Sequence, residues 1–284
     1  MRGISLVLLL LACSALGKTV PPDNGVYDYH LKVGMHEADR IRKAENEHRV
    51  AGGSTTTVAA VPYQAGLIIT FRLIQTSVCG GTIISDTRIL TGAHCNNDGN
   101  NIANSITVVV GSNFLFAGGT RVVYTGVTMH PGYNPWILAN DVAVVFIPRI
   151  SFSLFIQPIN LPTGSELYSN YVGTTGLASG FGITRDGDSV GLTQMRSSVN
   201  LRVIPNDECA STYGSVIQPS HMCTSGAGGV GTCLGDTGGP LVATVNNRRV
   251  LIGISSFTPR DGCQRNLPSG FSRVTTFTSW IREQ

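Results

Sequence analysis

Short runs of apolar, mostly β-branched residues recur along most of this chain, and they constrain its fold more than any other feature. Turns rich in Gly, Asn, Pro and Ser separate them. The runs span residues 67–71, 81–84, 106–110, 121–125, 141–147, 173–180, 195–203, 240–245 and 250–255. Many short strands at even spacing are typical of antiparallel barrels or sandwiches. Only the end has a helical pattern, at Val274, Phe277, Trp280 and Ile281. The sequence predicts an all-β fold with a C-terminal helix.

The N-terminus has the pattern of a secretory signal peptide. Arg2 is followed by an apolar run over residues 4–12 and by small residues that end at Gly17. A membrane anchor is the alternative, but spanning a bilayer takes about 20 apolar residues. We therefore expect residues 1–17 to be a signal peptide, the protein to be secreted, and no membrane association.

Residues 18–49 form a polar leader that differs sharply from the chain beyond it. They are rich in charge and could form a polar helix, but they lack a continuous apolar stripe to hold it against a core. All lysines lie before residue 50, and every later basic residue is an arginine. Because guanidinium stays charged in alkaline fluid, the later part suits alkaline conditions, although compositional drift would give the same pattern.

Cysteines and charge narrow the functional class. The chain has seven cysteines, and Cys13 would leave with the signal peptide. The others are Cys79, Cys95, Cys209, Cys223, Cys233 and Cys263. An even number in an exported chain indicates disulfides of undetermined pairing, and the absence of a Cys-x-x-Cys pair disfavours zinc. Residues 50–284 are nearly neutral with no basic cluster, so we expect no nucleic-acid partner. We also expect no bound metal and no cofactor.

Two polar residues stand in settings that suggest chemistry. His94 directly precedes Cys95, so a cysteine anchors the backbone beside the imidazole. Asp141 opens an otherwise apolar strand, where burial is costly unless a partner accepts its charge. Taken alone, Asp141 could also be an exposed residue at a strand edge.

A third stretch connects these residues to a known family. It reads Gly-Thr-Cys-Leu-Gly-Asp-Thr-Gly-Gly-Pro-Leu over residues 231–241. With Cys-Gly-Gly-Thr at 79–82, Ala-His-Cys at 93–95 and Asn-Asp-Val-Ala-Val at 140–144, the chain resembles the chymotrypsin-like (S1) serine peptidases over residues 50–284. Threonine stands at Thr237, where the family has serine. The resemblance implies two antiparallel six-stranded β-barrels, about 50–165 and 166–273, before the C-terminal helix.

The resemblance also implies a role for each motif residue. His94 would be the general base, Asp141 would orient it, and Thr237 would be the nucleophile. The amides of Gly235 and Thr237 would form the oxyanion hole. Residues 18–49 would be an activation propeptide: a trypsin-like peptidase would cut after Arg49, freeing the amino group of Val50 to pair with Asp236. No cysteine tethers the leader, so we expect it to come away after cleavage.

Disulfides and specificity follow from the same resemblance. The implied pairs are Cys79 with Cys95, Cys209 with Cys223, and Cys233 with Cys263. The implied substrate-pocket residues are Gly231, Ser256, Thr258 and Ser269. Gly231 lies at the pocket floor without a charge, so we expect cleavage after neutral or apolar residues rather than after Lys or Arg.

Thr237 leaves two functions open. Its β-branch restricts χ1, and its methyl group must point toward the histidine, the substrate or the oxyanion hole. One hypothesis is a secreted endopeptidase of reduced activity; the other is a catalytically silent homologue that binds peptides, protease inhibitors or other proteins. We expect a monomer acting on protein or peptide substrates. As an exported chain that lacks lysine beyond residue 50, it also resembles the gut digestive enzymes of insect larvae. This resemblance suggests digestion in an alkaline gut lumen.

Overall fold

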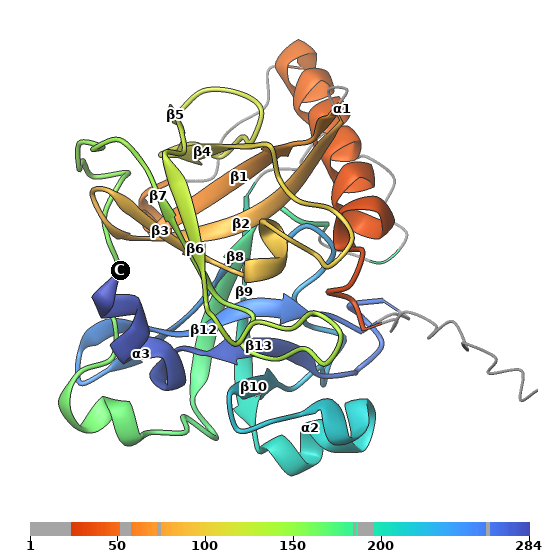
Figure 1. Cartoon of the computed structure of the whole chain (residues 1–284), viewed down its shortest axis with the longest axis vertical. Helices are drawn as coiled ribbons and strands as arrows, with labels where there is room; N and C mark the ends of the chain where they lie inside the picture. The colour runs from red at the N-terminus through yellow and green to blue at the C-terminus, as the bar shows by residue number, and fades with distance from the viewer. Residues whose placement is uncertain (1–23, 52–57, 73–74, 184–185, 187–195, 260–261) are drawn as a thin grey trace, which may run out of the picture.

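The computed structural model describes residues 24–51, 58–72, 75–183, 186, 196–259 and 262–284 (Figure 1). The expected signal peptide lies outside these residues. The described helices are η1 (His30–Gly34), α1 (Met35–Ala51), η2 (Val58–Ala60), η4 (Ala93–Cys95), η5 (Gly164–Tyr168), α2 (Asn206–Tyr213), η6 (Gly214–Val216) and α3 (Val274–Glu283). No helix in this part of the chain is long and apolar enough to span a membrane.

Two antiparallel sheets form the body of the protein. Within the described ranges, the first is a curled seven-stranded sheet in the order β5-β4-β1-β2-β3-β7-β6, and the second is a closed six-stranded barrel in the order β10-β13-β12-β11-β8-β9. The first comprises β1 (Gln64–Thr70), β2 (Thr76–Ser85), β3 (Arg88–Thr91), β4 (Ser105–Val110), β5 (Thr120–Val123), β6 (Gly126–Met129) and β7 (Ala143–Phe146). The second comprises β8 (Thr175–Gly180), β9 (Ser197–Ile204), β10 (His221–Thr224), β11 (Pro240–Val245), β12 (Arg248–Phe257) and β13 (Ser269–Arg273). The predicted all-β class with a C-terminal helix is confirmed, and so is a six-stranded barrel in the second half. In the described part of the first half, the expected six-stranded barrel is instead a curled sheet of seven strands whose edge strands β5 and β6 do not pair with each other.

The two sheets meet through polar as well as apolar contacts. The amide of Gly80 in β2 donates to the carbonyl oxygen of Thr237 at 2.6 Å. Ser179 in β8 donates through its hydroxyl to Gln64 in β1 at 2.7 Å. The first bond holds the loop before β11 against the first sheet and the second joins β8 to β1, so residues from both halves converge at the junction.

Three disulfides join the pairs that the resemblance implied. Their Cα atoms are 6.2 Å apart in Cys79–Cys95, 6.1 Å in Cys209–Cys223 and 5.1 Å in Cys233–Cys263. The first of these pairs joins β2 to η4, the short helix that carries His94. Cross-linking restricts the unfolded chain, so each bridge stabilises the fold.

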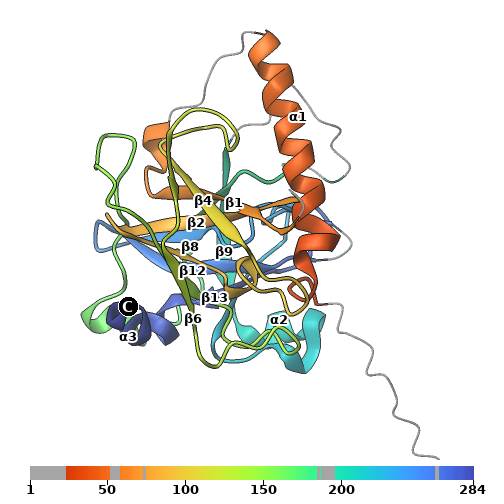
Figure 2. The same cartoon turned by 45° about the horizontal axis from the view of Figure 1, so that its top comes forward.

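The polar leader packs against the body, and our expectation that it lacks a face for packing was wrong. α1 runs beside the first sheet (Figures 1 and 2). Ala38 and Ile41 of α1 are buried with Val78, Leu115 and other apolar residues of the first half. Sequence analysis missed this contact because its stripe consists mainly of small alanines among charged residues.

Candidate active site

His94 is held by both covalent and backbone constraints. It lies in η4, directly after β3, and the neighbouring Cys95 is bonded to Cys79 of β2. Gly92 lies close to the ring, since an added Cβ there would lie 2.8 Å from His94 Cε1. The imidazole is completely buried, and its two nitrogens face two different partners.

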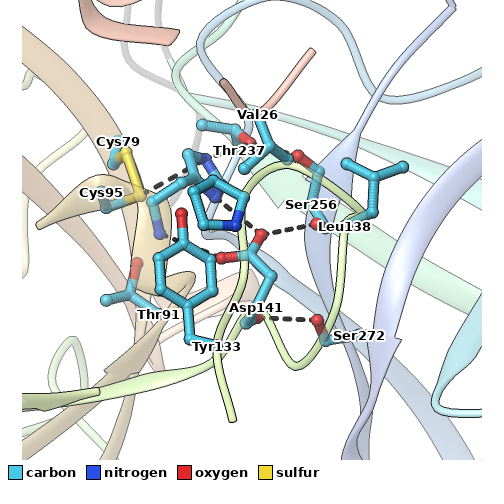
Figure 3. Close-up of polar contacts among 12 residues, drawn as sticks. Val26, Cys79, Thr91, Cys95, Tyr133, Leu138, Asp141, Thr237, Ser256 and Ser272 are labelled. Atoms are coloured by element: carbon cyan, nitrogen blue, oxygen red, sulfur yellow. Dashed lines mark hydrogen bonds and ion pairs between the residues drawn. A yellow bond between two sulfur atoms is a disulfide. The ribbon is translucent and has the colours of Figure 1, made fainter. Parts of the chain in front are cut away.

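Asp141 is the partner on one side of the ring. His94 Nδ1 lies 2.7 Å from Asp141 Oδ2, and the His94 amide donates to Oδ1 at 3.0 Å (Figure 3). Ser256 donates to the same carboxylate at 2.5 Å, and Ser272 donates to the Asp141 carbonyl at 2.7 Å. Burial alone would raise the pKa of Asp141, but attraction to His94 and the hydrogen bonds that the carboxylate accepts from His94 and Ser256 outweigh it and lower the pKa. The alternative of an exposed strand-edge aspartate is excluded, because Asp141 is fully buried.

Thr237 is the partner on the other side. Its Oγ1 lies 3.0 Å from His94 Nε2 and 3.2 Å from the carbonyl oxygen of Ser256. The hydroxyl has one proton and therefore donates to only one of these acceptors at a time. Thr237, His94 and Asp141 thus form a continuous polar chain in the order that nucleophilic catalysis requires.

The loop that carries Thr237 depends on glycine at two positions. Gly235 has φ of 94° and Gly238 has φ of 81°, a region that glycine adopts without steric cost. The amide of Gly238 donates to the Ser255 carbonyl at 2.7 Å. The loop is therefore bonded to β12 on one side and, through Gly80, to β2 on the other.

Asp236 lines a cavity of about 230 Å³, together with residues that include Gly180, Ile183 and Cys263. Its carboxylate accepts the amides of Gly182 and Cys233, each at 2.9 Å. Burial raises the pKa of Asp236 to about 6, although these hydrogen bonds oppose the shift. Val50, its expected partner, is still part of α1, whose C-terminal end projects beyond the first sheet (Figures 1 and 2).

The raised pKa predicts a pH dependence for the uncut chain. The folded form retains the Asp236 proton up to about pH 6, whereas an unfolded aspartate loses it near pH 4. The contribution of Asp236 to stability is therefore present below about pH 4 and lost as pH rises to about 6. We expect Asp236→Asn to remove this part of the pH slope, measured by urea unfolding at several pH values.

A matched substitution separates this effect from the loss of a negative charge. Asp207→Asn removes an exposed carboxylate in α2 and should leave the slope of the parent protein unchanged. A parent slope that persists in Asp236→Asn would contradict the assignment.

The expected substrate-pocket residues lie around two separate cavities. Gly231 lines the cavity of Asp236. Ser256 and Thr258 line another, of about 120 Å³, with Thr237 and the leader residues Gly25 and Tyr29. Ser269 is buried and accepts the amide of Thr232 at 3.0 Å. The four residues are therefore not joined in one open pocket.

Leader residues lie against His94 and Thr237, which sequence analysis did not predict. The rings of Tyr29 and His94 meet nearly at right angles, with their centroids 5.1 Å apart. Val26 is fully buried with Leu138 and Phe257, and Figure 3 shows it beside Thr237. As a result Thr237 is only 6% exposed. The hydroxyl of Ser256 on Asp141 was also missed, because it depends on a contact 115 residues apart.

Comparison with known proteins agrees with this geometry. The family model described as Trypsin matches residues 50–281. Collagenase of Hypoderma lineatum is 36% identical over 84% of this chain and 87% of that protein. Brachyurin of Leptuca pugilator is 34% identical over 83% of this chain and 98% of that protein.

A solved structure extends the likeness to three dimensions. The HL collagenase structure superposes with a TM-score of 0.72 at 36% identity, covering 81% of this chain and 96% of that chain. The chain therefore belongs to the trypsin family of chymotrypsin-like (S1) serine peptidases.

Proposed function

We propose that this chain is the zymogen of a secreted chymotrypsin-like endopeptidase whose mature domain hydrolyses peptide bonds slowly, with Thr237 as the nucleophile. The observation that carries the proposal is the distance of 3.0 Å between Thr237 Oγ1 and His94 Nε2, together with the bond from His94 to Asp141. Neutral or apolar side chains suit a pocket that has Gly231 at its floor.

The reaction follows from the positions of these atoms. Thr237 Oγ1 attacks the substrate carbonyl carbon as its proton passes to His94 Nε2, and His94 then gives that proton to the leaving amine. Water, activated by the same nitrogen, hydrolyses the resulting ester. The amides of Gly235 and Thr237 belong to the main chain, so the threonine leaves these oxyanion donors in place.

The state of Asp236 and of the leader supports the zymogen proposal. The carboxylate lies at a cavity while Val50 is still within a helix. Cleavage after Arg49 by a trypsin-like peptidase requires α1 to unwind locally, after which the new amino group of Val50 is free to enter the cavity. That ion pair would order the loop of Gly235 and join the divided pocket.

A silent homologue that binds peptides or inhibitors is the second candidate, and one contact favours it. If Thr237 donates its proton to the Ser256 carbonyl at 3.2 Å, His94 Nε2 no longer accepts a hydrogen bond from Thr237. The added methyl group restricts χ1, so rotation between the two acceptors is less free than for serine.

Covalent labelling tests the two candidates. The chain is cut with immobilised trypsin, the trypsin and the released leader are removed, and a fluorophosphonate probe is added to the leader-free parent, Thr237→Ser and His94→Ala. We expect slow labelling of the parent and roughly 100-fold faster labelling of Thr237→Ser, since a misplacement of about 1 Å costs that much in rate. His94→Ala is the control and should not label.

The outcomes separate the candidates. Labelling of Thr237→Ser alone establishes the silent homologue and refutes threonine catalysis. Comparable labelling of the parent and Thr237→Ser would contradict the proposal that threonine at position 237 slows the reaction.

A further inference from the structure

We infer that residues 24–46 of the leader are a peptide ligand of the active-site cleft, which stays bound and blocks the site after the Arg49–Val50 bond is cut. The binding part does not depend on whether Thr237 reacts. The inhibitory part rests on the proposed peptidase function. This inference replaces our expectation that the leader comes away because no disulfide tethers it.

Two apolar anchors cover the reacting atoms. Tyr29 is only 3% exposed, and its hydroxyl donates to the Val78 carbonyl at 2.8 Å while its ring meets His94. Val26 fills the space beside Phe257. Buried aromatic anchors near the centre of an interface contribute most of its binding free energy. These two residues therefore hold the leader where a substrate would approach Thr237.

Hydrogen bonds fix the backbone between and after these anchors. The amide of Asp28 donates to the carbonyl oxygen of Asp98 at 3.1 Å, and the amide of His30 donates to the Asp98 carboxylate at 2.9 Å. The Asn101 side chain donates to Asp28 at 3.1 Å. His30 Nδ1 lies 2.9 Å from the Ser77 hydroxyl. The segment is thus paired through both main chain and side chains.

Charged groups extend the contact along α1. Glu45 accepts the amides of Leu115 and of Phe116, the latter at 2.8 Å, and such charge-assisted bonds are about twice as strong as neutral ones. Glu37 is buried and paired with Arg40 at 2.6 Å. One Glu37 oxygen lies 3.5 Å from where a Cβ on Gly235 would stand. The leader therefore places the carboxylate of the Glu37–Arg40 ion pair beside the loop proposed to bind the oxyanion.

The leader crosses the site as a turn, and this conformation protects the leader from being cleaved as a substrate. The amide of Tyr29 donates to the Val26 carbonyl at 3.3 Å, and Asp28 has φ of 60°. Peptides that pair with a strand edge do so in extended form. The turn fills the cleft without presenting an extended peptide bond to Thr237.

Cleavage at Arg49 breaks none of these contacts, because the anchors and hydrogen bonds all involve residues up to Glu45. After cleavage the leader is a separate peptide, so its binding changes from intramolecular to intermolecular and its retention depends on its own affinity. Activation then requires a second event, dissociation or destruction of the leader.

The full chain tests this inference. A recognition sequence for a site-specific peptidase that cuts at its end is inserted directly before Val50, so that no other bond is cut. After cleavage, gel filtration without denaturant and mass spectrometry show whether the leader elutes with the domain. We expect it to co-elute in the parent and in Leu31→Ala, whose side chain in η1 is 43% exposed, but not in Tyr29→Ala.

A peptide competition keeps the test independent of folding of the variants. A synthetic peptide of residues 24–46 competes with a labelled copy for the cut parent protein from which the leader has been removed. We expect Tyr29→Ala in the peptide to weaken binding about 30-fold or more, and Leu31→Ala to change it by less than about 3-fold.

The outcomes distinguish failure of this inference from failure of the proposed function. Free elution of the parent leader, or equal competition by the Tyr29→Ala peptide, overturns the inference. In cut Thr237→Ser, fluorophosphonate labelling should be slow until the leader is released, and full labelling with the leader bound would overturn the inhibitory part. Intact peptide binding with no labelling of any leader-free form would instead contradict peptidase function.

Discussion

The Asp141→Asn substitution, made in the cut and leader-free Thr237→Ser variant, should lower kcat/KM about 10⁴-fold, as the same change does in the serine triads of this family. Asp141 accepts both the amide and the Nδ1 proton of His94. An asparagine amide would donate to Nδ1 instead, which leaves the proton on Nε2. His94 then has no lone pair with which to accept the proton of the nucleophile. The measurement is kcat/KM on a peptide substrate across pH.

A neighbouring substitution controls for general disruption. Ser272→Ala removes a hydroxyl that donates to the Asp141 carbonyl rather than to its carboxylate. It should lower kcat/KM less than about 10-fold, a modest loss for a group outside the proton path. An equal loss in Ser272→Ala and Asp141→Asn would mean that Asp141 acts only through folding.

Of the substitutions that we propose, Gly238→Ala should lower the free energy of unfolding the most. An added Cβ would lie 2.4 Å from Thr91 Oγ1 and 2.5 Å from the Gly80 carbonyl, and φ is 81°. Left-handed backbone costs about 1–2 kcal/mol for alanine, and overpacking adds about 1–3 kcal/mol. We therefore expect a loss of roughly 2–5 kcal/mol in the free energy of unfolding, measured with urea, and loss of fluorophosphonate labelling.

Gly228→Ala is the matched control for backbone strain alone. Its φ is 85°, but an added Cβ would meet no atom within 4 Å. It should cost only the conformational part, about 1–2 kcal/mol. If Gly238→Ala costs no more than Gly228→Ala, the two sheets do not clamp the nucleophile loop as described.

Much of the fold follows from local sequence patterns, and the missed elements have identifiable reasons. The β-branched runs correspond to strands such as β1, β4 and β11. β13 was missed because its sequence is mostly small and polar. Its burial depends on a distant neighbour, since an added Cβ on Gly270 would lie 2.1 Å from the Phe257 ring. Only the folded barrel shows that glycine is required there.

The candidate active-site residues could be predicted from the sequence, whereas the leader contacts could not. Each of His94, Asp141 and Thr237 stands in a short motif that can be recognised in the sequence without knowledge of tertiary contacts. The leader has no such motif. Tyr29 and Glu45 are one aromatic and one charged residue among many, and their partners Val78 and Leu115 lie 49 and 70 residues away.

By itself, the sequence determined the β class, the C-terminal helix and the three residues His94, Asp141 and Thr237 that the fold brings together, because periodicity and short motifs are local properties of the chain. Only the tertiary structure decided that Thr237 faces both His94 and the Ser256 carbonyl, that Asp236 lies at a cavity apart from Val50, and that the leader covers the site. Each of these depends on which distant residues share space after folding. A polar leader with few apolar residues packs on the body because the body supplies apolar surface for Ala38 and Ile41 and backbone amides for the Glu45 carboxylate.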